Sequence, residues 1–218
     1  MTWVLNNLDL IGELTLEHLY FALLPVLLGL VIALPLGWLA NESRLGRSIL
    51  TNVSGVLYTV PSLALFVILP AIINTRILDP INVVVALTIY TVALLVRTVA
   101  DALSAVSPAV VDAATAMGYP PLRRFVTVEL PLSVPVVLAG LRVATVSNIS
   151  LVTVGSVIGF GGLGKLFTDG FQRDIPEEIV AGIVLVLLIA LIADAALLLV
   201  GRALTPWDRS RVAERSSG

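Results

Sequence analysis

The chain has 218 residues and a net charge of −2; 58% of its residues are hydrophobic, 13% are charged, and its mean hydropathy is +1.03. Because about a quarter of the residues of a soluble domain are charged, this composition excludes a soluble globular protein and predicts an integral membrane protein. The chain contains no cysteine, which excludes a disulfide framework, a thiol nucleophile and a cysteine-based metal site, and its single histidine, His18, cannot form a metal site alone.

Five apolar runs are long enough to cross a bilayer as helices, which takes about 20 residues. Helices are favoured over strands because the runs exceed a barrel strand and because a helix satisfies its own backbone groups in lipid. The sequence therefore predicts an all-α membrane protein with five transmembrane helices in a single domain, with a lead-in over 1–19 and a tail over 204–218. The five runs are residues 20–40, 49–73, 81–102, 132–158 and 179–203.

Basic residues predict how the chain is oriented in the membrane. Most arginines follow the first, third and fifth runs, whereas the other side contains three basic residues and most of the acidic ones. By the positive-inside rule, the N-terminus is outside, the C-terminus is inside and residues 108–131 are cytoplasmic. The basic residues assigned to the inside are Arg44, Arg47, Arg97, Arg123, Arg124, Arg202, Arg209, Arg211 and Arg215, and those outside are Arg76, Lys165 and Arg173.

Proline lies inside the second apolar run. Pro61 removes one backbone hydrogen bond, so it predicts a kink and can leave a carbonyl free to face a polar path through the membrane. Ser62 is able to satisfy such a carbonyl or to line the same path. A kink that serves only helix packing is an equal alternative.

The stretch between the third and fourth runs predicts two short helices at the membrane surface. Gly118 can end the first helix, the following prolines prevent its restart, and Arg123 and Arg124 fall in the second. The small residues of this stretch would let another protein approach closely. The residues that form this pattern are Asp112, Ala113, Ala114, Gly118, Leu130 and Pro131. They resemble the loop with which permeases of ABC importers dock on their ATPase, although Asp112 stands where that family more often has glutamate. The alternative is an ordinary cytoplasmic loop.

The fourth run is the most polar of the five. Hydroxyl and amide groups within the membrane either bond to neighbouring helices or face water. Asn148, Ser150, Thr153 and Ser156 are therefore candidates for lining a translocation pathway, with interhelical packing as an equal alternative for each of them.

Residues 159–165 match one phosphate-binding pattern, G-x-G-x-x-G, and nearly match a second, the P-loop, but neither interpretation holds. Leu166 replaces the hydroxyl residue that would bind Mg²⁺, no soluble strand precedes the segment, and the predicted topology places it outside the cell. We expect a turn at the outer face, where a similar segment of osmoprotectant and methionine permeases forms a hinge or gate; a simple glycine-rich turn is the alternative. The candidate gate residues are Gly159, Gly161, Gly162 and Gly164.

Two charged pairs are predicted within the spans. Arg97 and Asp101 are four residues apart on one helix face. Arg142 and Asp194 lie at depths that differ by only about 3 Å at 1.5 Å per residue, so we expect them to form a buried ion pair between the last two helices. A proton relay is the alternative for this pair.

The chain as a whole resembles permeases of the osmoprotectant ABC importers, which take up glycine betaine, choline or carnitine. Besides the docking pattern, residues 59–66 and 16–19 carry this resemblance. It implies a type I importer permease fold in the bacterial cytoplasmic membrane, and a chain without a nucleotide site that is not an enzyme. ATP and Mg belong to partner ATPase subunits. The other implied partners are a second permease chain, identical or paralogous, and an external substrate-binding protein.

Three alternatives to an osmoprotectant permease stay open at this point. They are a permease of a methionine-type ABC importer, an ion-coupled secondary transporter, and a membrane scaffold without transport activity. Nothing in the sequence indicates nucleic-acid binding.

Overall fold

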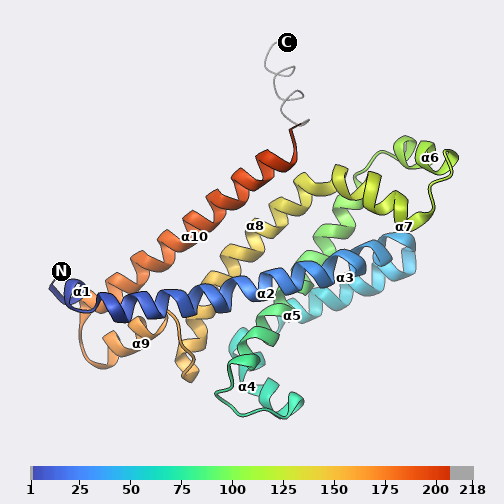
Figure 1. Ribbon diagram of the computed structural model, residues 1–218. Coiled ribbons are helices and arrows are strands. Elements are labelled where there is room, and N and C mark those ends of the chain that lie inside the picture. The colour runs from blue at the N-terminus through green and yellow to red at the C-terminus, as the bar shows by residue number, and fades with distance from the viewer. Residues whose placement is uncertain (1, 207–218) are drawn as a thin grey trace.

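The computed structural model describes residues 2–206, and throughout this range the regular elements are helices (Figure 1). The α-helices are joined by one π-helical segment, η1, and one 3₁₀ segment, η2. In chain order the elements are α1 (Thr2–Asn6), α2 (Leu8–Glu42), α3 (Arg44–Thr59), α4 (Ser62–Ile73), α5 (Pro80–Ser104), α6 (Pro108–Ala116), α7 (Pro121–Arg124), η1 (Phe125–Glu129), α8 (Leu130–Gly155), η2 (Ser156–Ile158), α9 (Lys165–Gln172) and α10 (Pro176–Leu204).

Four helical stretches of the described chain are long and apolar enough to cross a membrane, and α3 with α4 makes a fifth if the two count as one broken span. The four are α2, α5, the stretch Pro121–Ile158 from α7 to η2, and α10. These elements correspond to the five predicted runs. The first begins earlier than expected, because α2 starts at Leu8 rather than near residue 20 and extends for 35 residues, about 52 Å.

The second predicted span is not one continuous helix. Its two halves, α3 and α4, meet at an angle of 103° around Val60 and Pro61. Pro61 disfavours the helical conformation of the residue before it, and Val60 is extended with ψ at 128°. The carbonyl of Val60 accepts a hydrogen bond from the Tyr90 hydroxyl of α5, so this carbonyl is satisfied within the chain.

The third span, α5, is the centre of the bundle. In its most apolar window 61% of the residues are buried, whereas none is buried in the corresponding window of α10. Glycines let the neighbouring helices approach closely: a Cβ at Gly29 of α2 would lie 2.3 Å from Thr91, and one at Gly140 of α8 would lie 2.4 Å from Thr98. The exposed apolar surface of α10 is therefore left for lipid or for another chain.

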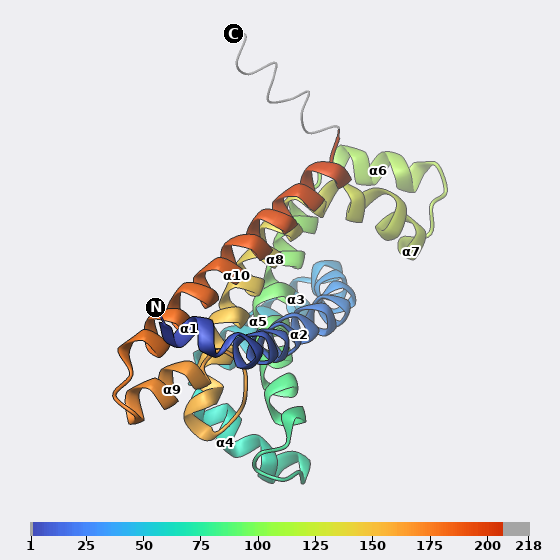
Figure 2. The same ribbon diagram turned by 60° about the vertical axis from the view of Figure 1, so that its left-hand side comes forward.

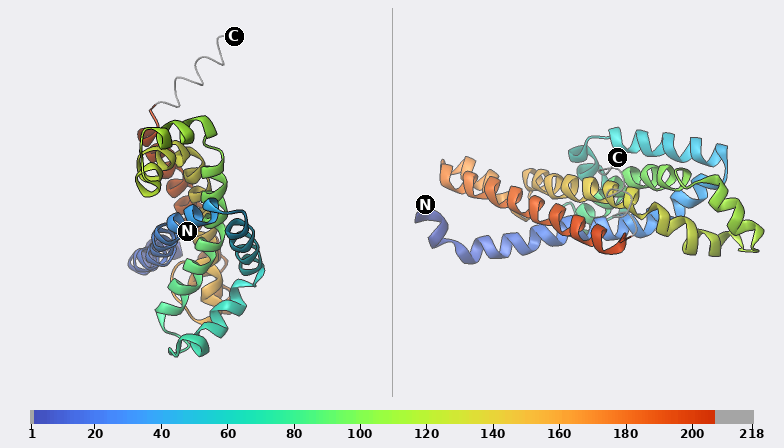
Figure 3. Two further views of the ribbon diagram at one scale, coloured as in Figure 1. Left: turned by 90° about the vertical axis from the view of Figure 1, so that its right-hand side faces the viewer. Right: turned by 90° about the horizontal axis from the view of Figure 1, so that it is seen from above.

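Two regions lie at opposite ends of this elongated bundle. Helices α6 and α7 form a hairpin at one end, and α1 and α9 lie at the other (Figures 1 and 2). The view from above in Figure 3 places the N-terminus and this hairpin farthest apart. We call residues 108–124 the α6–α7 hairpin and residues 159–164, between η2 and α9, the glycine loop.

Candidate functional site

The α6–α7 hairpin presents most of the predicted docking residues to its surroundings. Asp112 and Ala113 are exposed, and Gly118 adopts the left-handed conformation at φ 83° with open space where a Cβ would stand. Ala114 instead is buried, at 2% exposure. Leu130 and Pro131 lie half-buried at the start of α8, beyond the π-helical segment.

Two apolar side chains at the tip of the hairpin were missed in the sequence. Met117 and Leu122 are 70% and 62% exposed, on either side of the turn at Gly118. Exposed apolar groups close to a surface of small residues are typical of a protein contact. Their signal in the sequence was weak because a single methionine or leucine near a membrane span is unremarkable.

Arg124 connects the hairpin to neighbouring elements through hydrogen bonds and an ion pair. Its guanidinium donates to Glu129 Oε1 at 2.5 Å and to Thr115 Oγ1 at 3.0 Å, and it lies 3.6 Å from a carboxylate oxygen of Glu42 at the end of α2. The side chain of Glu129 is only 3% exposed, so Arg124 neutralises a nearly buried carboxylate. One arginine therefore connects α6, the π-helical segment and α2.

The predicted pathway residues do not share one environment. Asn148 is buried and donates to Thr91 Oγ1 of α5 at 2.9 Å, so in this chain it joins α8 to α5. Ser150 is exposed, Thr153 is half-buried, and Ser156 is buried and donates to the carbonyl of Thr153 at 2.7 Å. At the break between α3 and α4, Pro61 is exposed and Ser62 is half-buried.

Arg142 and Asp194 form a bidentate ion pair between α8 and α10. The Nε and Nη2 atoms of Arg142 each donate to a different carboxylate oxygen at 2.7 Å. The pair is not as deeply buried as expected, since the two side chains are 35% and 33% exposed. The reason is that α10 packs mainly on α8 and α9 and leaves its other side uncovered.

The second charged pair predicted from the sequence is present but weak. Arg97 lies 3.9 Å from Asp101, and the nearest cation to Asp101 is Arg47 of α3, at 2.6 Å.

The glycine loop is tied to the first long helix. The N–H of Gly162 donates to Glu17 Oε2 at 2.8 Å, and the N–H of Leu163 donates to His18 Nδ1 at 3.3 Å. Of the four predicted gate residues, Gly159 is exposed and the other three are buried. The sequence did not predict these hydrogen bonds, because the residues that they join are 145 positions apart.

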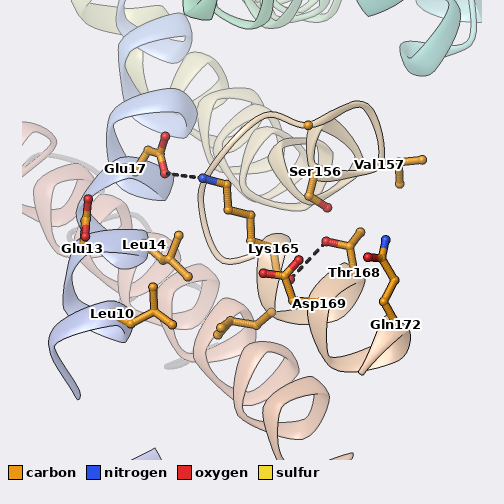
Figure 4. A pocket seen from close by; sticks show the side chains of 12 residues that line it. Leu10, Glu13, Leu14, Glu17, Ser156, Val157, Lys165, Thr168, Asp169 and Gln172 are labelled. Atoms are coloured by element: carbon orange, nitrogen blue, oxygen red, sulfur yellow. Dashed lines mark hydrogen bonds and ion pairs between the residues drawn. The ribbon is translucent and has the colours of Figure 1, made fainter. Parts of the chain in front are cut away.

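A cavity of about 880 Å³ adjoins the glycine loop (Figure 4). It is lined by α2, η2 and α9, and the close view shows Lys165 directed at the carboxylate of Glu17. Three carboxylates and one amine line it, but residues 2–206 contain no group of three or more histidine, aspartate or glutamate side chains placed to hold a metal ion. The charged lining residues are Glu13, Glu17, Lys165 and Asp169.

Comparison with known proteins identifies the family. The protein-family model described as the binding-protein-dependent transport system inner membrane component matches residues 26–206. The chain belongs to this family. It is therefore a multi-pass permease component of an ABC importer in the plasma membrane, and in such systems ATP is hydrolysed by a separate subunit.

Individual relatives agree with this assignment. The chain is 32% identical to the choline transport system permease protein OpuBB of Bacillus subtilis, with 94% of each chain covered. It is 30% identical to the osmoprotectant import permease protein OsmW of Salmonella typhimurium, over 94% of this chain and 96% of that one.

Among solved structures, the inward-facing MetNI methionine ABC transporter has a similar fold, with a TM-score of 0.81 and 22% identity over 91% of this chain and 97% of that one. The predicted all-α importer permease fold and the resemblance to osmoprotectant permeases are thus confirmed, and the methionine transporter shares the fold alone. The orientation of the two termini stays a prediction.

Proposed function

We propose that this permease translocates a quaternary ammonium osmoprotectant of the glycine betaine, choline and carnitine class. The observation that carries the proposal is the 32% identity to a choline permease over 94% of both chains. Other relatives named for glycine betaine, carnitine and choline cover 88–89% of the chain at 31–33% identity. The methionine transporter supports the alternative substrate only through its fold.

In this proposal the ATPase subunits, which hold ATP and Mg, dock on the α6–α7 hairpin. Asp112, Ala113 and Gly118 form the exposed part of the docking surface, and Met117 and Leu122 add apolar contact area. The hairpin faces the cytoplasm, with the N-terminus outside and the C-terminus inside, as the basic residues indicate.

A second permease chain, identical or paralogous, would complete the translocation pathway. The uncovered apolar face of α10 and the exposed parts of α8 supply surface for it. Ser150 and Thr153 of α8 are the candidates for lining the pathway, while Asn148 positions α8 against α5. The external binding protein would deliver substrate at the glycine-loop end.

Reconstitution of the complete transporter tests the function. The permease, its ATPase and its binding protein are placed in liposomes, and uptake of labelled choline, glycine betaine, carnitine and methionine is measured with ATP inside or with an ion gradient alone. ATP-dependent uptake of at least one quaternary ammonium compound supports the proposal. Uptake of methionine only, or gradient-driven uptake without ATP, would reject it.

A further inference from the structure

The imidazole of His18 joins the glycine loop to the helix that precedes it. Its Nε2 lies 3.1 Å from the carbonyl oxygen of Ile149 in α8, and its Nδ1 lies 3.3 Å from the N–H of Leu163. A backbone N–H can only donate, so Nδ1 is the unprotonated nitrogen and Nε2 carries the hydrogen. His18 is fully buried, and the loop cannot lift away from α8 without breaking a bond to this ring.

The neighbouring side chain, Glu17, holds the loop through a charge-assisted bond. Its Oε2 accepts from the N–H of Gly162 at 2.8 Å, and the same oxygen lies 4.0 Å from Lys165 Nζ. Such bonds are roughly twice as strong as those between neutral groups. The carboxylate is 36% exposed and stands at the wall of the cavity in Figure 4, so it is held between the loop and open space.

The shape of the loop is matched to these two side chains. A Cβ at Gly161 would fall 1.9 Å from the carboxylate oxygens of Glu17, and one at Gly162 would fall 3.1 Å from His18 Nδ1. Gly162 also has φ at 82°, which a residue with a side chain rarely adopts. Glycine at both positions lets the loop backbone lie directly against α2.

We propose that Glu17 and His18 are positioning residues that latch the glycine loop to α2, and that this latch opens during transport. The inference rests on the proposed function, because it assigns the latch to the transport cycle. The loop connects α8 to α9 and α10, so its place determines how these helices meet at this end of the bundle. Two hydrogen bonds from side chains of α2 to the loop backbone hold it there, and Phe160 and Leu163 of the loop also pack in the core, at 4% and 0% exposure.

Hydrogen exchange in the complete transporter, reconstituted in nanodiscs, tests the latch directly. Glu17→Ala is expected to speed amide exchange in residues 159–165 by about tenfold or more. Glu17→Gln keeps an acceptor oxygen and should show a smaller increase. The matched control is Glu13→Ala, one turn earlier on the same exposed side of α2, which should exchange like the wild type. Unchanged exchange in Glu17→Ala would overturn the inference.

The ratio of ATP hydrolysed to substrate taken up separates a latch from a merely structural contact. If the loop of Glu17→Ala opens at the wrong step of the transport cycle, ATP is hydrolysed without uptake, so this ratio should rise. In Glu13→Ala the ratio should stay unchanged. Faster exchange with an unchanged ratio would overturn the gating role. If the wild type showed no ATP-driven uptake at all, the proposed function would fail, and with it the role of the latch in transport, while the exchange data would still report the contact.

A second variant disturbs the contact between Glu17 and the glycine loop by a change in the loop. Gly161 has no positive φ, so Gly161→Ala places a methyl group against the Glu17 carboxylate without backbone strain. It should raise exchange and the ATP ratio as Glu17→Ala does, and should add little in a chain that already carries Glu17→Ala. Additive effects of the two changes would contradict the latch.

Discussion

The two ends of this permease are held in place by different chemistry. At the α6–α7 hairpin, side chain meets side chain: one arginine bonds to Glu129 and Thr115 and approaches Glu42. At the glycine loop, side chains of α2 accept hydrogen bonds from backbone N–H groups. The proposed docking surface keeps its outer face free because Arg124 bonds to it on the inner side. The glycine loop instead needs glycine so that its backbone can lie close enough to α2.

The largest effect is expected at the hairpin, from Arg124→Ala. This change leaves the carboxylate of Glu129 buried and unpaired, which costs about 3 kcal/mol or more. Thermal unfolding of the purified chain measures the loss. Arg123→Ala is the control, because Arg123 only stacks on Tyr119 at 4.9 Å and should matter by less than about 1 kcal/mol.

A double variant sharpens this result. Replacing Arg124 and Glu129 together by leucine removes both charges and should recover much of the lost stability. If Arg124→Ala were as stable as Arg123→Ala, the charged group would not be what holds the hairpin, and the contrast between the two ends would fail.

Gly118→Asp is expected to act on docking rather than on the fold. The residue has φ at 83° and open space around it, so the change strains the backbone by about 1–2 kcal/mol and adds a charge to the proposed docking surface. Binding of the ATPase should weaken by roughly tenfold or more. Titration of the ATPase onto the nanodisc-bound permease measures it, with Asn74→Asp as a control at another left-handed position. Normal ATP-driven uptake by Gly118→Asp would contradict the docking proposal.

The ion pair of Arg142 and Asp194 lies between the two ends and tests whether α8 and α10 act as one unit. Asp194→Asn and Arg142→Gln are each expected to lower uptake, and the double variant should be no worse than either single one because both remove the same bidentate contact. A double variant as impaired as the sum of the singles would show that the two residues act independently.

The sequence predicted the spans and the Arg142–Asp194 pair because both follow from distances along helices. It did not predict contacts that depend on how the helices are folded back on one another. Glu17 and His18 meet the loop across 145 positions. Arg124 and Glu129 are five apart, and a regular period of 3.6 does not align them; the π-helical segment does. Pro61 predicted a kink, but its angle depends on the packing of α3 and α4 against α5.

The smallest effect is expected from Glu42→Gln, which tests whether α2 connects the two ends. Glu42 is 43% exposed and lies 3.6 Å from Arg124, so its loss should change stability by less than about 1 kcal/mol and uptake by less than about fivefold.

However, α2 also carries Glu17 and His18, so motion of the hairpin can reach the glycine loop along this helix. In the wild type, ATP should then speed amide exchange in residues 159–165, and Glu42→Gln should reduce that response. Glu177→Gln, an exposed carboxylate on α10, should leave it unchanged. An ATP response that is identical in Glu42→Gln and the wild type would mean that the two ends are not linked through this contact.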